Sequence, residues 1–79
     1  MTDKQDEIVE LDVRGLNCPL PVLKARKRLA GLRTGDRLRV LATDPRAPED
    51  IAELCAVAGH RLVEQTESAG VFHFLLERR

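Results

Sequence analysis

Two stretches of the chain largely alternate between apolar and polar residues. An alternation with a period of two is typical of a half-buried β-strand. The sequence therefore predicts strands over residues 8–14 and 37–43, each with one face on the core. The inward-facing residues are Val9, Leu11 and Val13 in the first stretch and Leu38, Val40 and Ala42 in the second.

Two other stretches repeat their apolar residues at helical spacing. Between residues 19 and 32 the apolar residues follow an i, i+3, i+7, i+10 series, which predicts an amphipathic helix. A second helix is predicted to begin near Pro48, with Glu49 and Asp50 in its first turn and Gly59 as its C-cap. The apolar faces consist of Val22, Ala25, Leu29 and Leu32 in the first helix and Ile51, Leu54, Cys55 and Ala58 in the second.

Two short strand-like runs close the chain, over residues 62–66 and 71–76. Residues 67–70, Glu-Ser-Ala-Gly, separate them and predict a hairpin-like turn. In the last run, Phe72, Phe74 and Leu76 are expected to point into the core. The two final strands are therefore predicted to pair antiparallel.

The predicted element order is strand, helix, strand, helix, strand, strand. This order favours an α/β (α+β) two-layer sandwich, in which a four-stranded mixed sheet carries both helices on one face. Residues 1–7 are expected to form a flexible tail and residues 8–79 a single domain. The uncovered sheet face would then expose Leu41, Val63 and Leu75 among charged residues, either as ordinary surface or as a partner patch.

Composition narrows the range of functions. Thirteen basic and thirteen acidic residues give a net charge of zero, so the whole molecule has no general attraction to nucleic acids or anionic membranes. No apolar run reaches the roughly 18 residues of a membrane-spanning helix, and the polar N-terminus is unlike a signal peptide. Two distant cysteines without a Cys-x-x-Cys pair do not indicate a disulfide scaffold. We therefore expect a cytoplasmic protein with reduced thiols.

The candidate chemistry lies in residues 15–21, where the first strand gives way to the first helix. Proline is tolerated in the first turn of a helix, because the missing amide hydrogen would have no intrahelical partner there. This predicts Cys18 as the N-cap, Pro19 at the first helical position and Pro21 at the third. The amides of Leu20 and Cys18 would point outward, and together with the helix dipole they would make the Cys18 thiol ionise more readily. The alternative is that Cys18 only packs.

The other candidate ligands and bases are Cys55, His60 and His73. Cys55 lies on the apolar face of the second helix and is expected to be an inert core residue; a resolving thiol for Cys18 or a metal ligand are the alternatives. His60 and His73 are expected to be surface or strand residues rather than general bases. Together with Cys18 these three residues could form a Cys₂His₂ set, but they lack the closely spaced ligand pairs of structural zinc sites, so no metal site is predicted.

Basic residues gather in and after the first helix. Lys24, Lys27 and Arg28 are candidates for docking an acidic partner beside Cys18, which would aid encounter more than affinity. A solvated helix face is the plainer interpretation, and RNA binding is a third, although the chain has few aromatic residues for stacking bases. The full set is Lys24, Arg26, Lys27, Arg28, Arg33, Arg37 and Arg39, with Asp36 as the opposing charge.

The run from Leu11 to Pro21 resembles the start of the TusA/SirA-like sulfur-carrier family. That family has a Cys-Pro-x-Pro signature directly after a strand that ends in Asp-x-Arg-Gly. The resemblance continues through Asp44-Pro45 and Asp50-Ile51 to the final hairpin, so it covers nearly the whole chain. It implies that Cys18 is the catalytic residue. From the sequence itself, the residues expected to support the turn and the helix N-terminus are Arg14, Gly15, Asn17, Pro19, Leu20 and Pro21. For Arg14, and for Asp12 beside it, the alternative is that they only form the solvated face of the strand.

The resemblance implies a sulfurtransferase that is a carrier more than a turnover enzyme. Cys18 would accept sulfane sulfur as a covalent persulfide from a cysteine desulfurase or a rhodanese-like donor, with no other cofactor. The sulfur would pass to an acceptor protein in tRNA thiolation, molybdenum-cofactor assembly or sulfur oxidation. We expect a monomer that binds neither nucleic acid nor membrane directly. The alternative is a non-catalytic protein- or RNA-binding regulatory module, in which Cys18 is at most redox-sensitive.

Overall fold

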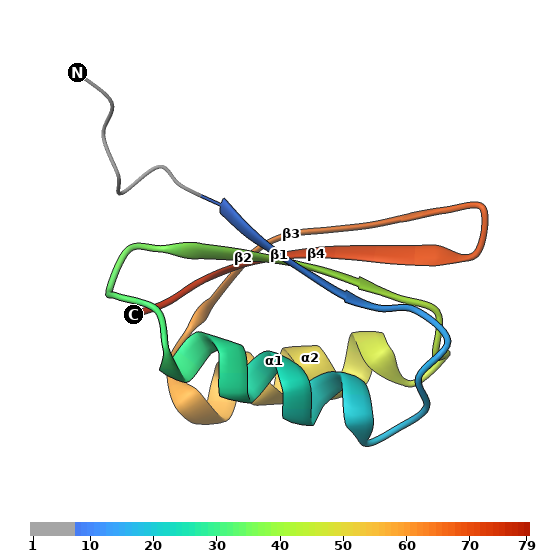
Figure 1. Ribbon diagram of the computed structural model, residues 1–79, viewed down its shortest axis with the longest axis horizontal. Coiled ribbons are helices and arrows are strands. Elements are labelled where there is room, and N and C mark those ends of the chain that lie inside the picture. The colour runs from blue at the N-terminus through green and yellow to red at the C-terminus, as the bar shows by residue number, and fades with distance from the viewer. Residues whose placement is uncertain (1–7) are drawn as a thin grey trace.

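The protein folds into two layers, a β-sheet and a pair of helices that cover one of its faces (Figure 1). The computed structural model describes residues 8–79, so the predicted tail at residues 1–7 lies outside the described part. The two-layer fold and its element order are confirmed. The elements are β1 (Ile8–Val13), α1 (Leu20–Ala30), β2 (Arg37–Ala42), α2 (Ala47–Ala58), β3 (Arg61–Ser68) and β4 (Val71–Glu77).

The sheet order places the starts of both helices at one end of the molecule. The strands lie in the order β1-β2-β4-β3, with β1 parallel to β2 and the other neighbours antiparallel. Because β1 and β2 are parallel, their carboxyl ends meet at the same end of the sheet, and the connections to α1 and α2 leave from there (Figure 1). This end of an α/β sheet is where ligands and catalytic groups usually gather.

The core lies between the sheet and the two helices and is almost entirely aliphatic. The predicted apolar faces are confirmed, apart from Ala58, which is exposed at the last position of α2. Phe72 and Phe74 stack with ring centroids 6.1 Å apart, and Phe74 is fully buried. The largest fully buried side chains are Phe74, Leu29, Leu38, Ile51, Leu76, Val13 and Val40.

The final hairpin is tighter than predicted. β3 continues to Ser68 and β4 begins at Val71, so the turn consists of Ala69 and Gly70 instead of residues 67–70. Both turn residues have positive φ, 52° at Ala69 and 81° at Gly70, as a two-residue hairpin of the type I′ class requires. Alanine is uncommon in this conformation, which is why the sequence pattern predicted a longer turn.

The sheet face without helices is more closed than expected. Leu75 on this face is only 7% exposed, although no helix covers it. Its cross-strand neighbours are Arg39 on β2 and Glu64 on β3, and long side chains at such positions cover the residue between them. Leu41 on the same face is half-buried.

Candidate functional site

Cys18 lies in the connection between β1 and α1, and its side chain is exposed. The helix begins one residue later than predicted, with Pro19 as the N-cap, Leu20 as the first helical residue and Pro21 as the second. The predicted role of Cys18 as the helix cap is therefore wrong. Pro21 is buried against the core, so the start of α1 is held in place while the cysteine stands outside it.

The two amides predicted to be free both have partners. The Leu20 N–H donates to the carbonyl of Asn17 at 2.9 Å, and this turn precedes the helix. The Cys18 N–H donates to Oδ2 of Asp44 at 2.5 Å. The prediction of outward-pointing donors beside the thiol is therefore wrong, because one partner is local and the other comes from a carboxylate 26 residues further along the chain.

Asp44 is the residue that sequence reasoning missed. It lies two residues after the end of β2, and it is only 8% exposed. Its second oxygen, Oδ1, accepts a hydrogen bond from the Arg46 N–H at 3.2 Å. One buried carboxylate thus joins the Cys18 loop to the start of α2. The sequence analysis named Asp44 only within the Asp44-Pro45 pair of the family resemblance and gave it no role at the site. The signal that could have found it is the parallel pairing of β1 and β2, which brings their following loops together.

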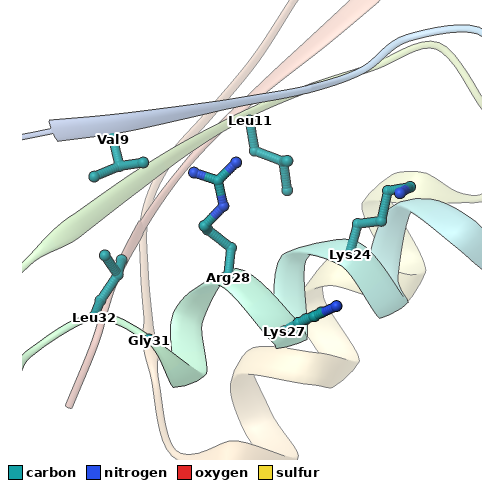
Figure 2. Close-up of a pocket in the computed structure, with 7 residues that line it drawn as sticks. All are labelled: Val9, Leu11, Lys24, Lys27, Arg28, Gly31 and Leu32. Atoms are coloured by element: carbon teal, nitrogen blue, oxygen red, sulfur yellow. The ribbon is translucent and has the colours of Figure 1, made fainter.

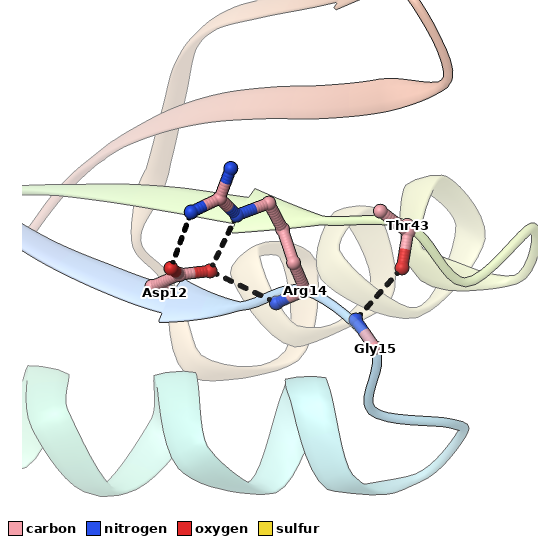
Figure 3. A network of polar contacts seen from close by, with 4 residues as sticks. All are labelled: Asp12, Arg14, Gly15 and Thr43. Carbon is pink, nitrogen blue, oxygen red and sulfur yellow. Dashed lines mark hydrogen bonds and ion pairs between the residues drawn. The ribbon is translucent and has the colours of Figure 1, made fainter.

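A second bond ties the same two loops together (Figure 3). The Gly15 N–H donates to Oγ1 of Thr43 at 2.9 Å. Gly15 has φ = 81°, a left-handed conformation that glycine adopts without steric cost, and it turns the chain away from β1 at this point. Gly15 therefore supports the turn through its backbone.

Arg14 does not contact the Cys18 loop. Its guanidinium forms a two-pronged ion pair with Asp12 on the same strand, with Nη2–Oδ2 at 2.7 Å and Nε–Oδ1 at 2.9 Å (Figure 3). The hydrogen bonds from the side chain and backbone of Arg14 lower the pKa of Asp12 to about 2. Both side chains are about half exposed, so the pair belongs to the solvated face of β1.

The Cys18 side chain opens into a groove of about 500 Å³ between the two helices. Two large apolar residues rim it and stand in solvent, Leu23 at 49% exposure and Val57 at 81%. The charged residues of the groove are Arg26 on α1 and Asp50 and Glu53 on α2. The groove thus combines an accessible sulfur, an apolar rim and a surplus of negative charge.

The surroundings of the thiol oppose its ionisation. Asp50, acting as hydrogen-bond acceptor for the thiol, is the main reason that the pKa of Cys18 is raised; partial desolvation adds to the effect. The charge of Asp50 also raises this pKa and that of Arg46 lowers it. The prediction that Cys18 ionises more readily than a free thiol is therefore wrong. The missed residue is Asp50, which the sequence pattern had placed only as a first-turn acid of α2.

The predicted docking residues lie elsewhere. Lys24, Lys27 and Arg28 line a separate hollow between α1 and β1, and none of them lines the Cys18 groove. Arg26 is the basic residue of α1 that does. The basic residues of α1 therefore lie on two sides of the helix, and only the side with Lys24, Lys27 and Arg28 forms a basic rim.

The second cysteine lies in the core, as predicted. Cys55 is 5% exposed, and burial raises its pKa, so it is an inert thiol. His60 precedes β3 and its Nδ1 accepts the Arg79 N–H at 3.1 Å, and His73 lies on β4. Residues 8–79 contain no cluster of three or more acidic, histidine or cysteine side chains that could hold a metal ion. No helix in the same range is long and apolar enough to span a bilayer.

Comparison with known proteins identifies the family of this chain. The model of the family described as sulfurtransferase TusA matches residues 9–78. The sulfur carrier protein TusA of Allochromatium vinosum is 45% identical over 69 residues, which cover 87% of this chain and 91% of that protein. Two further sulfur carrier proteins TusA, from Pseudomonas aeruginosa and Pseudomonas putida, are 42% and 40% identical over the whole chain and 98% of their own length.

The βαβαββ sandwich with an exposed cysteine after its first strand, together with the family match, thus defines a small α/β protein of the sulfurtransferase class. Within that class, the chain belongs to the TusA family. The resemblance seen in residues 11–21 is therefore confirmed and extends over almost the full length.

Proposed function

We propose that this protein is a sulfur carrier in which Cys18 holds sulfane sulfur as a persulfide between a donor protein and an acceptor protein. The observation that carries the proposal is the contrast between the two thiols. Cys18 is exposed at the edge of an open groove and its loop is bound to a buried carboxylate, whereas Cys55 is enclosed in the core. A cysteine desulfurase or a rhodanese-like protein is the proposed donor.

The proposed chemistry is exchange at sulfur. The Cys18 thiolate attacks the outer sulfur of a persulfide on the donor; a new S–S bond forms at Cys18, and the S–S bond in the donor breaks. The donor cysteine leaves as a thiolate with the electron pair of that bond, and it takes up the proton that Cys18 released. In the second step an acceptor nucleophile attacks the outer sulfur, and Cys18 leaves as the thiolate.

The raised pKa of Cys18 has two opposite effects on this exchange. It lowers the fraction of thiolate, which slows uncatalysed reactions with small molecules. It also makes the thiolate a poorer leaving group, so that a loaded sulfur is released less readily to an arbitrary thiol. Both effects favour a carrier that exchanges sulfur when a protein partner is docked.

The groove provides the surface for that docking. Leu20, Leu23 and Val57 are exposed apolar residues near Cys18, with exposures of 45%, 49% and 81%. Because Asp50 and Glu53 give the groove negative charge, a partner with a basic residue at its own active site fits best. Such a residue would screen Asp50 and lower the pKa of the Cys18 thiol on docking.

The carrier is proposed to act as a monomer in a reducing compartment such as the cytoplasm. Transfer to successive partners requires that one sulfur face each of them in turn. The final acceptor belongs to tRNA thiolation, molybdenum-cofactor assembly or sulfur oxidation.

Intact-mass measurement tests the proposal directly. After incubation with a persulfide donor, the protein gains about 32 Da, the mass of one sulfur atom, and loses it on reduction. Cys18→Ser abolishes the gain. Cys55→Ala is the matched control: it keeps the gain and lowers stability modestly, because it removes one buried sulfur. Loading that survives Cys18→Ser would disprove the assignment.

The raised pKa of Cys18 favours a second candidate function, a binding or regulatory module that uses the groove without sulfur chemistry. The same measurement separates the two. A folded protein that gains no sulfur at Cys18 from several different donors would support the binding module.

A further inference from the structure

A second concave surface lies on the far side of α1, at the free edge of the sheet (Figure 2). It is a hollow of about 470 Å³ between β1 and α1. Its apolar part consists of Val9 and Leu11 on β1 and Leu32 after α1, all half-buried. Its rim consists of Lys24, Lys27 and Arg28, all exposed, and Figure 2 shows Arg28 rising from α1 toward β1. The proposed sulfur chemistry does not use this surface.

The strand that borders the hollow has one unpaired edge within the described residues. β1 is the first strand in the sheet order and pairs with β2 alone. The N–H and C=O groups on its outer edge are a template for a further strand. A peptide that adds there would lie about 4.8 Å beyond β1 and over the outer flank of α1.

The rim has the charge and spacing of a site for an acidic strand. Within residues 8–79, no carboxylate forms an ion pair with Lys24, Lys27 or Arg28. Lys24 and Arg28 are four residues apart, about 6 Å along a helix, while side chains on one face of a strand repeat at about 6.6 Å. Two acidic residues at alternate positions of an added strand therefore match these two cations.

The alternation also restricts the other face of the added strand. Its remaining side chains would lie on the open face of the sheet, beside Glu10 and Asp12 of β1. Asp12 is paired with Arg14 on this face, but an acidic residue next to Glu10 would meet a like charge, which is unfavourable across neighbouring strands. The matching segment therefore carries acidic residues on one face only.

A second copy of this chain does not satisfy these conditions. Antiparallel pairing of two β1 strands would bring Glu10 and Asp12 of one copy close to the same residues of the other. It would also place the basic flanks of two α1 helices next to each other. The basic rims of two copies would therefore repel each other, and this surface fits a different, acidic partner better.

We propose that the edge of β1 and the basic rim formed by Lys24, Lys27 and Arg28 bind an extended segment of another protein, which adds to the sheet as a fifth strand and carries acidic residues at alternate positions. Strand addition is a recurrent mode of peptide recognition, in which backbone bonds give affinity and alternate side chains give specificity. This second contact site leaves the Cys18 groove free, so a partner can stay bound while the sulfur is exchanged.

The test uses a ten-residue peptide of alternating glutamate and threonine, titrated into the isotope-labelled full chain and followed by NMR. We expect the largest shifts at the amides of residues 8–13 and on the outer flank of α1. A control peptide with five glutamates followed by five threonines has the same charge, and we expect it to bind at least about tenfold more weakly. Equal binding of the two peptides, or shifts confined to other residues, would overturn the proposal.

Two sets of variants separate charge from backbone pairing. Lys24→Glu with Arg28→Glu is expected to weaken binding at least about tenfold, while the matched charge change Arg61→Glu with Arg79→Glu, remote from the hollow, leaves it within about twofold. N-methylation of alternate peptide amides in two complementary sets is expected to abolish binding in one set only, since half of the amides face β1. Full binding of both methylated sets would rule out strand addition.

The result does not depend on the sulfur chemistry. Cys18→Ser is expected to bind the alternating peptide as the unchanged protein does, because Cys18 lines the other groove. If the protein failed to take up sulfur at Cys18, the expected binding of the peptide would not change. If the peptide failed to bind, the expected sulfur loading would not change. Tighter binding of a ten-nucleotide single-stranded RNA than of the peptide at the same residues would assign the rim to nucleic acid and overturn the proposal.

Discussion

At the scale of single residues, two carboxylates control the cysteine in different ways. Asp44 is buried and holds the backbone of Cys18, whereas Asp50 lies in the groove and acts on the sulfur. Asp44 therefore determines the position of the cysteine, and Asp50 determines how readily its thiol loses a proton. The two effects can be separated by changing one residue at a time.

Replacing Asp50 is expected to make Cys18 more reactive. In Asp50→Asn the negative charge beside the thiol is gone, so the pKa of Cys18 falls and more thiolate is present at neutral pH. The rate of alkylation by iodoacetamide, measured against pH, should rise at pH 7 and reach half of its plateau at a lower pH. Glu49→Gln is the control, since Glu49 is also in the first turn of α2 but does not line the groove. An unchanged pH profile in Asp50→Asn would contradict the assignment.

Replacing Asp44 is expected to lower stability. Asp44→Ala leaves the Cys18 and Arg46 amides without their acceptor, and a buried group that loses its partner costs about 1–3 kcal/mol. Asp44→Asn keeps one acceptor oxygen and should lose less. Denaturant unfolding gives the values, and Asp12→Ala, at an exposed ion pair, serves as the control with a smaller effect. Equal stability of Asp44→Ala and the unchanged protein would show that these bonds contribute nothing.

The residue scale also marks the limit of local sequence reasoning. The position of Cys18 at a strand-to-helix junction followed from the pattern around it. The acceptor of its amide did not, because Asp44 is 26 residues away and only the pairing of β1 with β2 brings it near. The prediction that the pKa of the Cys18 thiol is lowered was wrong for the same reason, because Asp50, which raises this pKa, belongs to another helix.

At the scale of elements, most boundaries agree with the hydrophobic pattern because each element buries one face. β1 and β2 differ from the predicted ranges by one residue at their ends. α1 is shorter than predicted, since Pro19 caps it and Gly31 ends it. The hairpin differs most, because its turn depends on the backbone conformation of Ala69 and not on burial.

The turn offers a test at this scale. Ala69 has φ = 52°, which is unfavourable for a residue with a side chain. Ala69→Gly removes this cost and loses part of the gain through a more flexible unfolded chain, so we expect up to about 1 kcal/mol of net stabilisation. Ala56→Gly, on the exposed side of α2, should instead lose about 1 kcal/mol. Thermal unfolding that ranks the two variants the other way round would contradict the turn geometry.

At the scale of the whole molecule, the exposed edges of the sheet are protected against self-association. β1 carries Glu10 and Asp12, and β3 carries Arg61, Glu64 and Glu67 together with an irregular register after Leu62. Charges and bulges at edges discourage pairing between identical sheets. We therefore expect a monomer of 8.8 kDa by sedimentation equilibrium at all protein concentrations up to the millimolar range. A concentration-dependent dimer would show that another surface, such as the apolar rim of the Cys18 groove, joins two copies.

The bond between Cys18 and Asp44 makes the position of this cysteine depend on correct folding of the sheet. The two residues belong to different crossovers, and they meet only when β1 and β2 pair in the observed register. A slip of one position would move Asp44 by more than 3 Å along the strand direction and release the cysteine loop. A misassembled molecule would therefore hold the Cys18 sulfur on a loop without this restraint, and under the proposed function it would exchange sulfur more slowly with a docked partner.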